Sequence, residues 1–440
     1  MADILPFRAL RYDLARIKRI EDVVTPPYDV IGPREQESYL AASPYNIVRL
    51  ELPQAGPDHG PDGGDGWAQK AGQWLRQWRQ EGVLVRDPAG SFYYCETDYT
   101  AQGERRCRRG FIGLVRADEF GGAVRRHEMT FSRVKAGRLS LIRECRANLS
   151  PVFGLYEDPP DRAIEALRAS AQGPPEVVFE DRGGCGHRLW RVSDAQKTLS
   201  EVVAALKDSL IVIADGHHRY ETAVAYRQQM RATFPDAPPE AAFNYVMIYL
   251  CNSQDKGLTV LPSHRLLAAP EGFSLEEFDR RASVWFEVRH FSGANKTPFL
   301  AALAEGGRAG NAIGFYAGGG YRLLLLKEGV MSGPEAEGLP GPVRALDVVV
   351  FSRLLLQRVL NLPGDEDERL IQYISDTDRA LQAAQETGRL AFLLNPTPVA
   401  QVQEVARQRL TMPRKSTYFY PKVMSGLTIN PLEYPASDVF

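Results

Sequence analysis

LIVIADGHHRY (residues 210–220) is the stretch of sequence that predicts the fold most directly. Its apolar run LIVIA is short and rich in β-branched residues, which is typical of a buried strand. Gly216 permits a tight turn, and residues 220–230 have the composition of a helix. The first turn of a helix has unpaired backbone N–H groups and a partial positive charge. This strand–turn–helix unit therefore predicts an anion site, with phosphate as the usual ligand.

The side chains of residues 215–219 fit the same prediction. Arg219 is a bidentate donor, and His217 and His218 add neutral or cationic donors. Asp215 suits a Mg²⁺ ion that is shared with phosphate oxygens, or a substrate hydroxyl. The alternative is an Asp N-cap above solvated side chains, since Asp N-caps are common. A site that holds only a metal is less favoured, because the adjacent His217 and His218 would point about 100° apart on a helix.

A second candidate is the pair His127-Glu128, which lies in a basic context with Arg125, Arg126, Arg133, Lys135 and Arg138. A glutamate at the mouth of a phosphate site is a candidate general base. Taken alone, these residues favour the start of a surface helix.

A third candidate is MPRKST (residues 412–417), with Lys415, Ser416 and Thr417. A basic loop with two hydroxyls that follows a helix can close over a polyphosphate. It is not a Walker A loop, because the required glycines are missing. The composition alone leaves a functional and a structural interpretation equally open.

The whole chain has an ordinary globular composition, with 44% hydrophobic and 25% charged residues in 440. The net charge of -2 provides no global attraction for nucleic acid or an anionic membrane. We find no signal peptide and no apolar run of membrane-spanning length, so we predict a cytoplasmic protein. The five cysteines have wide spacings without a CxxC pair, which indicates neither a disulfide framework nor a zinc ribbon.

Helical and strand patterns alternate along the chain in a mixed order. A helix is predicted at residues 67–80 and hairpins at residues 91–117 and 311–329, while residues 54–66 have the composition of a loop. Because the regular alternation of a doubly wound sheet is missing, we predict an α+β fold with mixed sheets.

With these segments in place, the chain resembles a large prokaryotic family, domain of unknown function 1015 (DUF1015). The resemblance rests on PFRALRYD, TPPYDVI, HEMT, NLSPVFGLY, ADGHHRYETA, LPSHRLL, MPRKSTYFYPK and SGL, which span nearly the whole sequence. The chain is also similar to the archaeal ADP-dependent free serine kinases. Those enzymes have the ParB/sulfiredoxin-like fold and carry an HE pair, a DGHHR box and a PKTT segment in this order. Here Arg414 stands where the kinases have proline.

The resemblance to the kinases implies a role for each segment. Glu128 would be the base that takes the proton of the acceptor hydroxyl. Asp215 and His218 would act in catalysis, with Asp215 as the Mg²⁺ ligand, and the nucleotide would be bound by Gly216, His217, Arg219, Lys415, Ser416 and Thr417. The chain is longer than the kinases, both before Arg125 and between residues 264 and 389.

The resemblance also suggests four segments. Residues 1–124 would form an N-terminal α+β region with a hairpin, and residues 125–265 the ParB/sulfiredoxin-like phosphate-binding core. Residues 266–390 would be an inserted α+β region, and residues 391–440 would complete the active site.

We therefore predict a serine kinase-like phosphotransferase. It would use Mg²⁺ and either ADP or ATP to phosphorylate a small hydroxyl compound, with free L-serine as the first candidate and O-phosphoserine as the product. We expect no membrane or nucleic-acid partner; the sequence leaves room for a homo-oligomer.

Two other functions fit the same fold. A ParB-like switch that binds CTP and associates with DNA would share the phosphate box, but the charge and the lack of a helix-turn-helix signature count against it. A sulfiredoxin-like enzyme would need a cysteine in the turn, where this chain has His217 and His218.

Overall fold

The computed structural model describes residues 2–52, 64–129, 132–193, 196–363 and 370–434. These residues form two compact units. Unit 1 comprises Met1–Arg125, Thr130–Thr259 and Pro421–Phe440, and unit 2 comprises Arg126–Met129 and Val260–Tyr420. The chain thus passes from one unit to the other one residue before the HE pair and three residues after the MPRKST segment. Each unit has its own sheet and is described separately.

Unit 1 is built on a mixed sheet with the strand order β6-β11-β8-β12-β5-β4-β10-β9, and β1 pairs with β5. Two of the pairings, β11 with β6 and β12 with β8, are parallel, and the others are antiparallel. The strands are β1 (Ile4–Leu5), β4 (Phe92–Ala101), β5 (Glu104–Arg116), β6 (Val124–Arg125), β8 (Val152–Tyr156), β9 (Val177–Glu180), β10 (Gly186–Val192), β11 (Ile211–Asp215) and β12 (Tyr245–Asn252). Short pairs are formed by β2 (Leu10–Tyr12) with β3 (Leu84–Arg86) and by β7 (Ala147–Asn148) with β21 (Asn430–Pro431).

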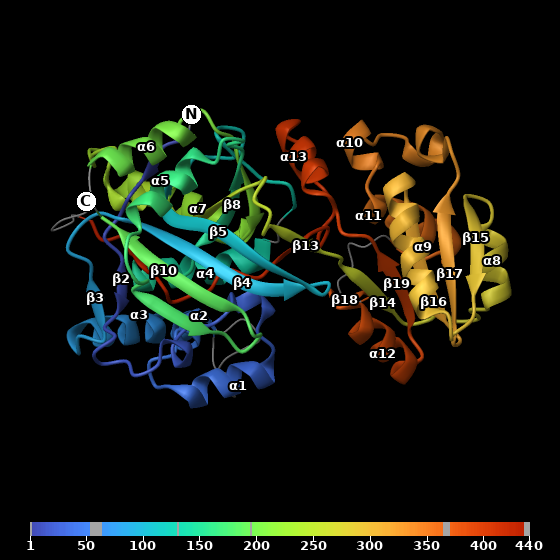
Figure 1. Cartoon of the computed structure of the whole chain (residues 1–440), viewed down its shortest axis with the longest axis horizontal. Coiled ribbons are helices and arrows are strands. Elements are labelled where there is room, and N and C mark those ends of the chain that lie inside the picture. Colours follow the sequence, from blue (N-terminus) through green and yellow to red (C-terminus); the bar gives the residue numbers. More distant parts are fainter. Residues whose placement is uncertain (1, 53–63, 130–131, 194–195, 364–369, 435–440) are drawn as a thin grey trace. The chain divides into compact units, whose positions relative to one another are not determined.

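Helices pack against this sheet. Figure 1 shows α5 and α6 side by side over it, and the apolar residues of α5, α6 and α7 share one core with the strands. The helices of unit 1 are α1 (Pro33–Ala42), α2 (Val48–Glu51), α3 (Gly64–Gln80), α4 (Ser132–Cys145), α5 (Arg162–Ser170), α6 (Gln196–Leu206) and α7 (His217–Thr233). The prediction of a helix at residues 67–80 is confirmed by α3.

The strand–turn–helix unit predicted at residues 210–220 is also confirmed. Strand β11 is buried through Ala214, and α7 begins two residues after its end. The N-cap residue Gly216 has φ +86°, a conformation that side chains with a Cβ rarely adopt. A Cβ at this position would also lie 2.8 Å from Arg219 Nε. The turn therefore requires glycine for two independent reasons.

Unit 2 has an antiparallel sheet with the order β15-β17-β16-β19-β14-β18. Its strands are β14 (His264–Leu267), β15 (Phe286–Phe291), β16 (Ala312–Ala317), β17 (Gly320–Leu326), β18 (Gln372–Ile374) and β19 (Leu390–Leu394). Its helices are α8 (Leu275–Ala282), α9 (Lys296–Ala309), α10 (Gly341–Arg344), α11 (Asp347–Val350), α12 (Thr377–Thr387) and α13 (Val399–Arg407), with a π-helix, η6 (Phe351–Val359), after α11. Residues of α9 and α12 pack against strands in its core.

The predicted α+β class with mixed sheets is confirmed, as are the two hairpins, which are β4–β5 and β16–β17. The four predicted segments are distributed differently over the two units, because residues 1–124 share their sheet with most of residues 125–265. Of the predicted loop at residues 54–66, residues 54–63 lie outside the described part. Residues 64–66 belong to α3, so the helix begins earlier than predicted.

Candidate functional site

In unit 1, Asp215 stands at the end of β11 between two cations. Lys422 Nζ donates to its Oδ1 at 2.9 Å, and Arg219 Nη2 donates to its Oδ2 at 2.8 Å. Arg219 also donates through Nη1 to the carbonyl oxygen of Pro151. The side chains of all three charged residues are at most 15% exposed, so solvent screens these ion pairs weakly. The carboxylate therefore fixes two cations at the N-terminal end of α7.

The two histidines of the box occupy the first turn of α7. His217 is buried, whereas His218 is half-buried, and Thr222 Oγ1 donates to the His218 carbonyl oxygen at 2.6 Å. Their backbone N–H groups belong to the helix end, where i−4 acceptors are missing. The backbone donors, the helix dipole and two cations thus coincide at one place, which is a favourable setting for an anion.

Further charged residues surround Arg219. Burial alone would lower the pKa of Arg219, but the neighbouring acidic groups outweigh this effect, so the pKa is raised. Among these groups, Asp215 has the largest effect and Asp29 the next largest. Tyr28 and Glu51 contribute in the same direction. Burial also raises the pKa of Tyr28. The segment TPPYDVI therefore contributes two side chains to the surroundings of the DGHHR box.

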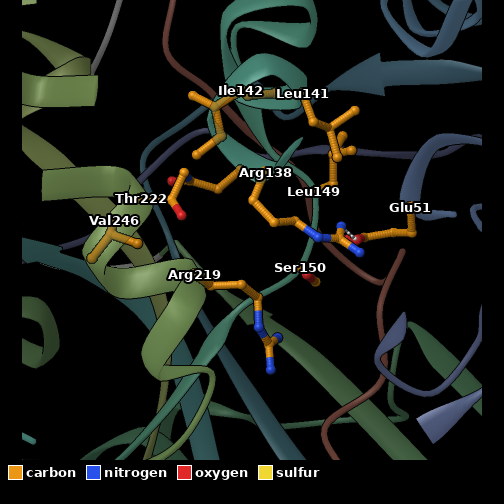
Figure 2. A pocket seen from close by; sticks show the side chains of 11 residues that line it. Glu51, Arg138, Leu141, Ile142, Leu149, Ser150, Arg219, Thr222 and Val246 are labelled. Carbon is orange, nitrogen blue, oxygen red and sulfur yellow. Dashed lines mark hydrogen bonds and ion pairs between the residues drawn. The ribbon is translucent and has the colours of Figure 1, made fainter. Parts of the chain in front are cut away.

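A cavity of about 40 Å³ lies beside these residues in unit 1. Glu51 Oε2 accepts a hydrogen bond from Arg138 Nη1 at 2.8 Å, and the Arg138 guanidinium lies 3.1 Å from the centre of the Tyr28 ring. Figure 2 shows Glu51 and Arg138 meeting on one side of the cavity, with Arg219 and Thr222 projecting from α7 on the other. The cavity is therefore connected to the anion site through Arg219.

In unit 2, Glu128 is held by the segment that was predicted to lie beside it. Its Oε1 accepts from the backbone N of Ser416 at 3.0 Å, and from the backbone N and the Oγ1 of Thr417, each at 3.3 Å. The Glu128 side chain is 17% exposed. Because the three donors converge on one oxygen, they fix the orientation of the carboxylate. Residues 288 positions apart thus meet in one cluster.

The neighbouring residues support this cluster. His127 is fully buried, its Nε2 lies 3.0 Å from Thr417 Oγ1, and its carbonyl oxygen accepts from Met412 N at 2.7 Å. The side chain of Ser416 is turned inward and donates to the Pro413 carbonyl oxygen. Lys415 is exposed and has φ +54°, so the backbone turns at this residue. The HE pair and the predicted Lys415–Thr417 segment are thus brought together in unit 2.

Comparison with known proteins gives the family. The sequence model described as protein of unknown function (DUF1015) matches residues 4–349. The chain belongs to this family. No curated protein matches the sequence.

Solved structures give only distant matches to this DUF1015 protein. A free serine kinase variant in complex with ADP is 11% identical, with a TM-score of 0.34, over 70% of this chain and 86% of that chain. SbnI with a C-terminal truncation, from Staphylococcus aureus, is 11% identical, with a TM-score of 0.36, over 73% and 87% of the two chains. A conserved hypothetical protein from Pyrococcus furiosus is 12% identical, with a TM-score of 0.32, over 70% and 89%. TM-scores of this size do not establish a common fold.

The predicted Mg²⁺ site at Asp215 can be tested against the geometry of this DUF1015 chain. Both carboxylate oxygens of Asp215 already accept from cations, so a directly bound ion would lie close to Arg219 and Lys422. Among the described residues, no group of three or more His, Cys, Asp or Glu side chains gathers to hold a metal. Coordination of Mg²⁺ by Asp215 together with nucleotide phosphates stays a prediction.

Several site residues were not singled out from the sequence. Lys422 and Tyr28 lie within the motifs MPRKSTYFYPK and TPPYDVI, which carry the resemblance to DUF1015, and Arg138 belongs to the basic context of the HE pair. Glu51 carried no signal, because a single glutamate in an apolar stretch has no periodic pattern.

In the described part of the chain, no helix is long and apolar enough to cross a membrane.

Proposed function

We propose that this DUF1015 protein is a phosphotransferase that moves a phosphoryl group from ADP or ATP to the hydroxyl of a small molecule, with free L-serine as the first candidate. The observation that carries the proposal is the contact between Glu128 and the Ser416–Thr417 backbone. The resemblance to the serine kinases requires the HE pair and the lysine–hydroxyl segment to cooperate. It is also consistent with a second cluster, Asp215, Arg219 and Lys422, at a helix N-terminus.

The two clusters would have different roles in the reaction. Glu128 would take the proton from the acceptor hydroxyl as its oxygen forms a bond to the terminal phosphorus. The bond between that phosphorus and the bridging oxygen breaks, and AMP or ADP leaves. Backbone N–H groups of α7 with Lys422 and Arg219 would bind the phosphates, and Lys415 would stabilise charge that develops during transfer. Positioning and charge stabilisation supply most of the catalysis in this class of reaction.

Mg²⁺ enters the proposal as the counter-ion of the nucleotide phosphates, with Asp215 as its proposed protein ligand. A cytoplasmic location remains part of the proposal.

Product analysis tests the proposal. Purified protein is incubated with Mg²⁺, L-serine and either ADP or ATP, and O-phosphoserine and the nucleotide product are quantified by mass spectrometry. We expect equal amounts of O-phosphoserine and of AMP or ADP. A protein that binds nucleotide, as shown by calorimetry, but forms no phosphorylated product from L-serine or other small hydroxyl compounds would contradict the proposal.

A further inference from the structure

Glu51 is the last residue of α2, and within the described residues only one of its two carboxylate oxygens has a hydrogen-bond partner. The residue is 2% exposed, and Arg138 occupies its Oε2. Its other oxygen, Oε1, is buried and has no hydrogen-bond partner among the described residues. A buried acceptor left without a donor costs about 1–3 kcal/mol, and more when it is charged. A donor from outside the chain, either a water molecule or a ligand group, would remove this cost, and the cavity that Glu51 lines provides the room for one.

The cavity next to Glu51 limits the size of that donor. Its volume of about 40 Å³ accommodates roughly three water-sized groups. This is enough for a small polar group with one or two carbon atoms, but not for a nucleoside. The walls include apolar side chains that would pack against such carbon atoms, namely Leu141, Ile142, Leu149 and Val246 (Figure 2).

The charges around the cavity decide between a neutral and a cationic donor. An ammonium group offers a buried carboxylate an opposite charge and three donors, whereas a hydroxyl offers one donor and no charge, so the ammonium group suits Glu51 better. The charged side chains that line the cavity are Glu51, Arg138 and Arg219. Arg138 is paired with Glu51 and Arg219 with Asp215, so each cation of the lining already has a carboxylate partner.

We infer that Glu51 is a specificity-determining residue and that its Oε1 receives a primary ammonium group of the phosphoryl acceptor. The inference rests on the proposed function and assigns part of the acceptor to the cavity that Arg219 shares with the anion site. The acceptor class is then a small hydroxyl compound with an ammonium group, rather than a sugar or a hydroxy acid.

A pair of ligands tests this assignment on the wild-type protein. L-Serine and 3-hydroxypropionate share the hydroxyl and the carboxylate and differ in the ammonium group. Calorimetry without nucleotide should show L-serine binding at least tenfold more tightly. In Glu51→Gln, which keeps an acceptor for Arg138, the preference should shrink to about twofold. The control Glu201→Gln, at an exposed carboxylate of α6, should keep it.

Two outcomes would overturn the inference: equal binding of both ligands by the wild-type protein, or an undiminished preference in Glu51→Gln. If Glu51→Gln does not fold, a crystal structure of the wild-type protein with L-serine replaces it. An ammonium nitrogen within about 3.2 Å of Glu51 Oε1 supports the inference, and any other position overturns it.

Measurements of ligand binding and of turnover together distinguish a failure of this inference from a failure of the proposed function. Serine binding that depends on Glu51 without any phosphoryl transfer would support the inference and contradict the kinase. Formation of O-phosphoserine with an unchanged preference in Glu51→Gln would support the kinase and overturn the role of Glu51.

Discussion

Lys422 donates from Nζ to Asp215 Oδ1 at 2.9 Å and so joins the end of β11 to a segment 207 positions away. The contact places a lysine beside the DGHHR box that the sequence comparison did not select. Lys415, which the resemblance selects, is exposed in unit 2. We therefore assign nucleotide binding, which the resemblance gives to Lys415, to Lys422 instead, and we keep Lys415 for the transfer step.

Lys422→Met and Lys415→Met should have different effects. Under the proposed function, removing Lys422 deletes a charge-assisted contact to phosphate worth about 1.5–3 kcal/mol, so the Kd of ADP should rise at least tenfold. Removing Lys415 should leave the Kd within twofold and lower kcat by about a hundredfold, because its charge acts during transfer. Calorimetry and single-turnover assays measure both quantities. The reverse pattern would show that Lys415 binds the nucleotide and Lys422 only anchors Asp215.

Glu128→Gln should abolish turnover and preserve nucleotide binding. The amide keeps an oxygen acceptor for Ser416 N and Thr417 N but takes no proton, and loss of a general base lowers kcat by about 10²–10⁴-fold. Nucleotide affinity is measured by thermal shift and kcat by product formation. If Glu128→Gln binds nucleotide tenfold more weakly, Glu128 is part of the binding site rather than a base.

Because its hydroxyl contacts Glu128 and His127, Thr417 is predicted to position Glu128 rather than to bind the nucleotide as the resemblance implies. Its hydroxyl reaches both Glu128 Oε1 and His127 Nε2, so Thr417→Val should lower kcat by about tenfold without changing nucleotide affinity. Thr417→Ser keeps the hydroxyl and should restore most of the activity. Equal losses in Val and Ser variants would instead indicate that the methyl group and local packing matter.

Sequence reasoning could find the features that are encoded locally, but not those that depend on contacts between distant segments. The β11–Gly216–α7 unit is local: an apolar run, a glycine and a helical composition define it within twenty-odd residues. The approach of Glu128 to Ser416 has no local signature, and only the order of motifs shared with another family suggested it. The contacts of Glu51 with Arg138 and of Lys422 with Asp215 depend on how distant segments pack, which no sequence period records.

Gly216→Ala should destabilise unit 1 and weaken anion binding. The substitution forces a Cβ into a backbone with φ +86° and to within 2.8 Å of Arg219 Nε, so the cost should exceed the roughly 1–3 kcal/mol of backbone strain alone. Gly184→Ala is a matched control, since Gly184 has φ +77° but no atom lies within 4 Å of the place that a Cβ would occupy. Urea unfolding measures both variants. Equal losses would mean that contact with Arg219 adds nothing.

His264 should make unit 2 sensitive to acid. Burial, aided by Arg265 and opposed by Asp376, lowers its pKa to about 4. The neutral ring fits its contacts, since Leu394 N donates to Nδ1 at 3.2 Å and Thr377 Oγ1 lies 2.9 Å from Nε2. A proton on Nδ1 would remove the acceptor for Leu394.

The unfolded chain takes up this proton near pH 6.5 and the folded chain only near pH 4. The contribution of His264 to stability is therefore complete above pH 6.5 and is lost as the pH falls toward 4, by about 3 kcal/mol in total. Asp347, whose pKa burial raises to about 6, acts in the opposite direction in part of this range. Comparing urea unfolding of the wild type and His264→Gln at each pH cancels that effect. A constant difference between the two proteins from pH 7 to pH 4 would show that His264 does not titrate there.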